Sequence, residues 1–258
     1  MSYQHIELHP APIARLVLNR PDRRNALSLA LMLEVVEALN SIAATADVRV
    51  LVVEGAGPVF SAGHDLAEMT STRDESFYKE LFSVCVTMMT QLHDLPQPVI
   101  AKVHGVATAA GCQLVAACDL AVAADDARFA TPGVNIGLFC STPMVPVQRA
   151  VGRKRALEML LTGEMVDART ALEWGLLNRV VPAGELEGEV VALAERIAAA
   201  SAYVVALGKR AFYAQDALPE DAAYALACAV MVDNALTDDA HEGMRAFLEK
   251  RAAVWPSK

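Results

Sequence analysis

The sequence lacks the cysteine pattern of a disulfide framework or a zinc site. Its five cysteines show no Cys-x-x-Cys spacing and are odd in number, whereas stapled domains and structural zinc sites use paired or closely spaced cysteines. We therefore expect buried free thiols in a reducing compartment and no bound metal. The cysteines stand at positions 85, 112, 118, 140 and 228.

Long apolar runs and clusters of basic residues are also missing. No apolar run reaches the roughly 18 residues that a membrane span needs, and the N-terminus has no apolar core of signal-peptide length. The formal net charge is -9, and an acidic chain without a Lys/Arg run is a poor electrostatic match for nucleic acid or an anionic membrane surface. We expect no nucleic-acid partner, no membrane and a cytoplasmic location.

What the sequence does contain is apolar residues, at 54% of 258 positions, enough for a sizeable core. Strands alternate with helices along most of the chain, which predicts an α/β fold with buried, near-parallel strands. In the first helical stretch the apolar spacing falls on Leu29, Met32, Leu33, Val36 and Leu39. We expect strands at 13–21, 48–55, 98–105 and 119–125, and helices at 25–45, 76–93, from about 110 and at 154–162.

Strand patterns stop at about residue 185. Three amphipathic helices are expected after it, at 185–201, 221–237 and 239–255. We therefore predict an α/β core at 1–195 and a helical region at 196–258. Because helices this apolar need a partner surface, the second region should be a lid or an oligomerisation element.

Two strand-to-helix turns are candidates for a binding site. In "VFSAGHDLAEM" (59–69) small residues allow close backbone approach to a ligand, and amides at a helix start are free to face it. In "GVATAAGCQLVAAC" (105–118) a helix starts near Ala110 with its positive dipole end outward. On neighbouring strands these turns could place two N–H donors around one oxygen, an oxyanion hole. A tight turn and a close helix–strand contact are the plain alternatives.

These segments resemble the crotonase superfamily, also called the enoyl-CoA hydratase/isomerase family. The similarity extends to "RPDRRNALS" (20–28) and "ALEMLLTGEMVDARTALEWGLLNRVVP" (156–182), and so covers nearly the whole chain. It implies a spiral of ββα units followed by helices that assemble trimers, often paired into hexamers. It also implies an acyl-CoA thioester as partner, with coenzyme A entering as part of the substrate and no separate cofactor.

The resemblance also assigns residues by position. The backbone N–H groups of His64 and Ala110 would be the oxyanion donors, and the methyl groups of Ala109 and Ala110 would narrow a turn that usually contains glycines. Asp65 could instead cap a helix, and each basic residue could be a solvated surface charge. The implied coenzyme A contacts are Arg24, Ala26, Leu27, Ala62, Asp65 and Leu66, with Lys250 reaching a neighbouring subunit.

The two glutamates that hydratases of this family use are absent. Their positions lie three residues after the second donor and twenty residues further on, and they hold Gln113 and Gly133. A glutamine amide cannot take up a proton near neutral pH, and glycine has no side chain. Acid–base groups typically contribute about 10²–10⁴-fold each, so losing both should make hydration slow or absent even with an intact oxyanion hole.

Other groups could replace the glutamates. Cys140 could act as a base or nucleophile if it ionises, although a buried structural thiol is the plainer interpretation. The imidazole of His64 would put a titratable group beside the thioester. A serine hydrolase is disfavoured because the chain has no Gly-x-Ser-x-Gly turn. An enoyl-CoA hydratase/isomerase with divergent chemistry, a non-catalytic acyl-CoA carrier or sensor, and a structural oligomer all stay open.

Overall fold

A six-stranded sheet forms the centre of the protein in the computed structural model, which describes residues 3–256. β1 pairs antiparallel with β2, and each of the other neighbours in this sheet pairs parallel. The predicted α/β fold with near-parallel strands is thus confirmed. In sheet order the strands are β1 (Ile6–His9), β2 (Ile13–Leu18), β3 (Val50–Gly55), β4 (Val99–Val103), β6 (Leu120–Ala124) and β9 (Arg179–Val181).

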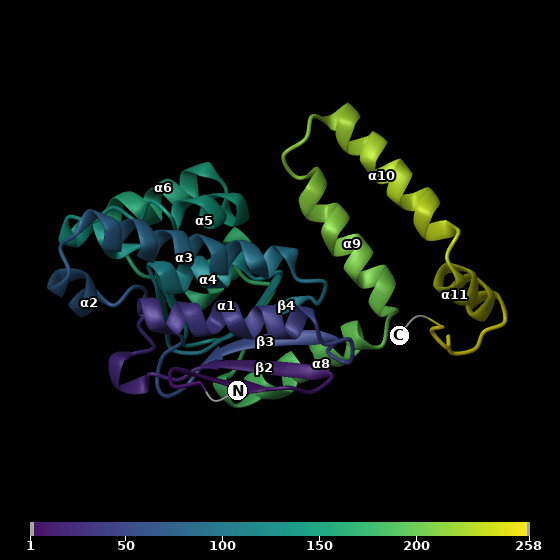
Figure 1. Cartoon of the computed structure of the whole chain (residues 1–258), viewed down its shortest axis with the longest axis horizontal. Coiled ribbons are helices and arrows are strands. Elements are labelled where there is room, and N and C mark those ends of the chain that lie inside the picture. The colour runs from purple at the N-terminus through teal and green to yellow at the C-terminus, as the bar shows by residue number, and fades with distance from the viewer. Residues whose placement is uncertain (1–2, 257–258) are drawn as a thin grey trace.

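Helices cover both faces of this sheet, so residues on both faces of its central strands are largely buried (Figure 1). Leu51 and Val53 of β3 pack into the core beneath α1 (Leu29–Ala43), α3 (Glu75–Asp94) and α4 (Ala110–Ala117). Val50 and Val52 point to the opposite face and pack against α8 (Leu186–Ala198). Both sets are almost fully buried, so each face holds its own apolar layer.

A second, smaller sheet consists of β5 (Val106–Thr108), β7 (Arg128–Ala130) and β8 (Val166–Asp167). From β4 to β7 the chain alternates between the two sheets: β4 is followed by β5 and then α4, and β6 by β7 and then the 3-10 helix η2 (Pro132–Ile136). This is the repeated ββα unit that the resemblance implies. The short helices are η1 (Pro21–Arg23), α2 (Leu66–Ser71), α5 (Met144–Val151), α6 (Arg153–Thr162), α7 (Ala168–Trp174) and η3 (Ala183–Glu185).

The buried side of α1 differs from the predicted one. Leu33 is 47% exposed, although its spacing placed it on the expected core face. The helix packs against α3 as well as against β1 and β2, so its buried face is turned toward both neighbours. The residues that it buries are Leu31, Met32, Val35, Ala38, Leu39 and Ile42.

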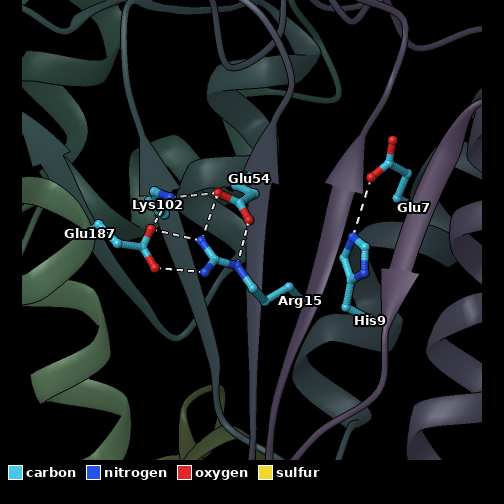
Figure 2. Close-up of polar contacts among 6 residues, drawn as sticks. All are labelled: Glu7, His9, Arg15, Glu54, Lys102 and Glu187. Carbon is cyan, nitrogen blue, oxygen red and sulfur yellow. Dashed lines mark hydrogen bonds and ion pairs between the residues drawn. The ribbon is translucent and has the colours of Figure 1, made fainter.

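Four charged side chains join α8 to the sheet (Figure 2). Arg15 of β2 pairs with Glu54 of β3 at 2.7 Å and with Glu187 of α8 at 2.6 Å. Lys102 of β4 pairs with both carboxylates, at 2.7 Å to Glu54. Although partial burial opposes it, hydrogen bonding to Arg15 first and then to Lys102 lowers the pKa of Glu187 to about 2. Together these residues form the α8 charge network.

The last three helices extend away from the rest of the fold (Figure 1). They are α9 (Ala202–Gln215), α10 (Glu220–Ala235) and α11 (Asp238–Leu248). No helix was predicted at the position of α9, and the predicted domain boundary at residue 195 falls inside α8, which still packs on the sheet. Within residues 3–256 no single helix has the length and hydropathy of a membrane span, although the bent pair Ala183–Ala198 and Ala202–Gln215 meets both criteria together.

Candidate functional site

The two turns singled out in the sequence lie against each other. Ser61 forms a parallel bridge with Ala107, and its carbonyl oxygen accepts the N–H of Thr108 at 3.0 Å. Gly63 has a φ of +88°, and a Cβ there would lie 2.8 Å from the Thr108 oxygen and 3.0 Å from the Ala110 nitrogen. A glycine is therefore required at 63 for the first turn to approach the second this closely.

Each turn includes a residue on the cavity wall whose backbone N–H is unpaired among residues 3–256. The Leu27 N–H donates to Gly63 O at 2.8 Å, and the Asp65 N–H donates to Leu27 O at 3.2 Å. These two hydrogen bonds flank His64 and leave its own N–H without a partner in the bridge. Ala110 is the first residue of α4, where an N–H has no intrahelical partner. Within residues 3–256 neither N–H donates a hydrogen bond, and both residues line one cavity.

The second turn is strained. Ala109 adopts a φ of 50° and a ψ of -119°, a region that residues with a side chain rarely enter. Its N–H donates to Ala130 O at 2.9 Å, and Gly63 packs closely against its methyl group. Left-handed backbone costs a non-glycine residue about 1–2 kcal/mol, so the surrounding contacts must hold this turn in shape.

The cavity beside the two turns has a volume of about 440 Å³ and mostly apolar walls. A larger groove of about 810 Å³, between residues 10–12, residues 45–49 and Trp255, contains none of the predicted site residues. Of the residues that line the smaller cavity, His64 and Cys140 alone carry titratable side chains. Its walls are formed by Ala62, His64, Leu66, Phe82, Ala109, Ala110 and all residues of the segment 132–143 other than Val134 and Gly137.

The two positions without glutamate differ in their surroundings. Gln113 is buried on α4 outside the cavity lining, with its Oε1 atom 4.0 Å from the sulfur of Cys85. Gly133 lines the cavity, but a Cβ there would lie 1.9 Å from Leu138 O and 2.9 Å from the sulfur of Cys140. The chain between 133 and 140 therefore fills the space that a side chain at 133 would need.

Cys140, the nucleophile suggested by the sequence, lines the cavity and is 7% exposed. Burial raises the pKa of its thiol, and a hydrogen bond from Gly133 only partly offsets this effect. The thiol is therefore protonated at neutral pH. This protonation state weakens the hypothesis that Cys140 acts as a thiolate base.

His64 is one of the residues that line the cavity. The ring of Phe82 meets its imidazole edge to face, with centroids 5.5 Å apart and planes at 88°. Burial lowers the pKa of His64 to about 4, so the ring is neutral at pH 7. Its Nε2 atom is sealed from solvent and has no hydrogen-bond partner among the described residues.

The segments predicted to contact coenzyme A lie side by side. The Ala62 N–H donates to Arg24 O at 3.0 Å, and Leu27 bridges to His64. Ala26 and Leu27 are buried, whereas the side chain of Arg24 is exposed. Exposed groups for a ligand therefore come mainly from Arg24 and from Leu66, which is 47% exposed.

Asp65 caps α2, as one of the two interpretations of the sequence predicted. Its carboxylate accepts the N–H groups of Ala67 and Glu68 at 3.1 and 3.3 Å and pairs with Arg20 at 3.0 Å. Burial favours a higher pKa for Asp65, but these hydrogen bonds outweigh it and lower the pKa. Lys250 follows α11, is exposed and does not line the cavity of its own chain.

Asn25 is an important site residue that the sequence analysis did not select. Its buried amide donates to the carbonyl oxygens of Ala56, Val59 and Phe60 at 2.8, 2.9 and 3.2 Å, and its Oδ1 accepts the Arg20 N–H at 3.0 Å. It thereby fixes the strand that leads into the first turn. The residue type was a usable clue, because asparagine is enriched in left-handed positions and Asn25 has a φ of 51°.

The fold and the paired turns agree with the comparison to known proteins. The family model described as enoyl-CoA hydratase/isomerase matches residues 9–258, and the chain belongs to this family. It is 50% identical over 245 residues to "Enoyl-CoA hydratase domain-containing protein 3, mitochondrial" of Rattus norvegicus, covering 94% of this chain and 81% of that protein. The Homo sapiens protein of the same name is also 50% identical, with 94% of this chain and 80% of that protein covered.

Two crystal structures are similar over almost the whole chain. Enoyl-CoA hydratase from Mycobacterium smegmatis has a TM-score of 0.96 and 47% identity, covering 98% of this chain and 99% of that one. Human enoyl coenzyme A hydratase domain-containing protein 3 has a TM-score of 0.95 and 47% identity, covering 98% and 100%. The crotonase fold predicted from the motifs is confirmed.

The prediction of a cytoplasmic location is contradicted by these relatives. The rat, mouse, human and zebrafish proteins at 49–50% identity are named as mitochondrial. The prediction relied on the lack of an apolar segment, which argues only against a secretory signal. Mitochondrial transit peptides are amphipathic and need no such segment, so the reasoning could not distinguish the two locations.

Proposed function

We propose that this protein binds acyl-CoA thioesters and holds the thioester oxygen between the backbone N–H groups of His64 and Ala110. The observation that carries the proposal is the pair of unpaired N–H groups on the wall of one apolar cavity. A buried ligand oxygen would give both donors a partner, and donors in an environment from which water is excluded act more strongly than donors in water. Membership of the enoyl-CoA hydratase/isomerase family supports the choice of a thioester.

The proposed chemistry stops short of efficient hydration. Two donors can stabilise an enolate-like anion, and one such donor is typically worth about 10²–10³-fold in rate. Adding water across a double bond also requires proton transfer, and the cavity lining holds no carboxylate for it. We therefore propose an acyl-CoA-binding protein whose crotonyl-CoA hydratase activity is weak or absent, either a divergent enzyme or a carrier.

A binding titration combined with a hydration assay tests this function. Wild-type protein should bind butyryl-CoA and hydrate crotonyl-CoA barely above background. Gly63→Ala should weaken butyryl-CoA binding at least about tenfold, because its methyl group would push the two turns apart. Gly188→Ala is the matched control, since a Cβ at Gly188 meets no atom within 4 Å.

Two outcomes would contradict the proposal. Vigorous hydration would mean that a proton-transferring group acts in this cavity after all. No binding of butyryl-CoA at millimolar concentration would instead favour a structural oligomer as the function.

Self-association is proposed as well. Large apolar side chains of α9, α10 and α11 are exposed in the single chain, among them Phe247 at 83%, Leu248 at 79% and Met231 at 66%. Such surfaces are rare on a protein that works as a monomer. We propose that copies of this chain cover these helices, in a trimer or a dimer of trimers.

A further inference from the structure

His64 presents two hydrogen-bonding groups at the cavity, and the proposed function uses only one of them. Its backbone N–H is the proposed oxyanion donor, and its imidazole packs against Phe82, which lines the same cavity. The Phe82 ring, 5.5 Å away and nearly perpendicular, limits the positions that the imidazole can take. The second group is thus held in place next to the first.

The two ring nitrogens differ in their surroundings. Nε2 is sealed from solvent and unpaired among the described residues, whereas Nδ1, which also forms no hydrogen bond there, is not sealed in this way. A buried N–H without a partner is rarer in proteins than a buried acceptor without one. The favoured neutral tautomer therefore carries its proton on Nδ1, and this N–H donor is the one that a ligand can reach.

The two donors of His64 match a particular arrangement of ligand oxygens. The backbone nitrogen and Nδ1 are separated by the same number of covalent bonds as a thioester oxygen and an oxygen on the β carbon. A 3-oxoacyl thioester therefore has the covalent reach to accept hydrogen bonds from both donors at once. A saturated acyl chain has no acceptor to offer the second donor.

We propose that the His64 imidazole is a specificity-determining group that selects 3-oxoacyl-CoA thioesters. This inference rests on the proposed function, since it requires the thioester oxygen to lie at the His64 N–H. Two other polar side chains of the cavity are less suitable. The Ser141 hydroxyl already donates to Phe139 O at 3.4 Å, and the amide of Asn135 packs next to Gly163.

The test compares the affinities of acetoacetyl-CoA and butyryl-CoA, which differ in the β oxygen. Calorimetry measures both dissociation constants for wild type, His64→Asn and His64→Leu. Asparagine can place an N–H donor near the Nδ1 position, and leucine has a similar size without a donor. Wild type and His64→Asn should prefer acetoacetyl-CoA by about tenfold, the effect of one hydrogen bond, and His64→Leu should show a ratio near one.

The outcomes separate this inference from the proposed function. If wild type binds both ligands equally, or if His64→Leu keeps the preference, the imidazole does not select the ligand. If wild type binds neither ligand, the proposed function itself fails. His9→Phe, outside the cavity lining, controls for loss of a histidine, and thermal melting shows whether each variant is folded. If His64→Leu does not fold, His64→Phe takes its place in the same comparison.

Discussion

Gly133 shows how a single residue has changed the chemistry that this cavity can support. Its own backbone is ordinary, but Leu138 O stands 1.9 Å from where its Cβ would be. The Leu138 N–H in turn donates to Gly133 O at 2.9 Å, which holds the segment in this position. Restoring a glutamate at 133 would therefore require the whole segment up to Cys140 to move.

Substitutions at Gly133 should thus reduce stability without creating hydratase activity. We expect Gly133→Ala to lower the free energy of unfolding by about 1–3 kcal/mol, as overpacking typically does. Gly133→Glu should lower it further and leave crotonyl-CoA hydration at the wild-type level. Urea denaturation and a hydration assay measure the two effects, with Gly184→Ala as a control because a Cβ there meets nothing within 4 Å. A Gly133→Glu variant that is stable and hydrates crotonyl-CoA would show that this segment rearranges easily.

At the scale of residues, the motifs marked two turns that lie against each other, but they did not show how these turns are held. The motifs located His64 and Ala110, because small residues at strand ends mark turns whatever their neighbours. They did not reveal that Asn25 binds three carbonyl groups, which depends on contacts across 31–35 residues of sequence. The positive φ of Ala109 was also hidden, since the strain is sustained by tertiary contacts.

Among the elements, α8 depends on charge as well as on its apolar face. The α8 charge network connects it to three strands, and Glu187 is the member that α8 contributes (Figure 2). Its side chain is 49% exposed, so solvent screening limits the stabilisation that it provides. The lowered pKa nevertheless gives that stabilisation a definite dependence on pH.

We expect Glu187→Gln to lower the free energy of unfolding by at most about 1 kcal/mol at pH 7 and low salt. The folded pKa is about 2 against an ordinary 4.5, so the carboxylate stabilises the fold fully above pH 4.5 and progressively less as the pH falls toward 2. The difference between wild type and variant in urea denaturation should therefore shrink below pH 4.5. Glu195→Gln, at an exposed position on the same helix, should show no comparable trend. A difference that grows on acidification would contradict this account.

Elements with a strong pattern were predicted well, and short or unpatterned ones were missed. β2, β3, β4 and β6 are rich in apolar residues because both of their faces are covered, and their charged residues belong to the α8 charge network. β8 has two residues and β5 and β7 have three each, too few for any periodicity to be recognised. In α9 every residue keeps some exposure in the single chain, so no buried stripe marked it as a helix.

At the scale of the whole molecule, the three C-terminal helices are anchored at one end and uncovered along the rest. Lys209 of α9 is buried against the core, where its ammonium donates to Leu92 O and Gln97 O and pairs with Asp119 at 2.7 Å. The Tyr213 hydroxyl donates to the same carboxylate at 2.7 Å. This anchor fixes α9 to the core, while α10 and α11 keep exposed apolar side chains. Such a surface is consistent with association between copies of the chain.

We expect the wild-type protein to sediment at about three or six times the mass of one chain, as the proposed assembly requires. Phe247→Glu should shift it toward single chains, because burying an unpaired carboxylate in an apolar interface is strongly unfavourable. Leu33→Glu is the matched control, since Leu33 is exposed on α1, away from the C-terminal helices, and this change should leave the mass unaltered. Sedimentation equilibrium over a range of concentrations distinguishes the cases. Wild-type protein that remains a single chain at all concentrations would contradict self-association. The apolar surface of α9, α10 and α11 would then have to bind a different protein.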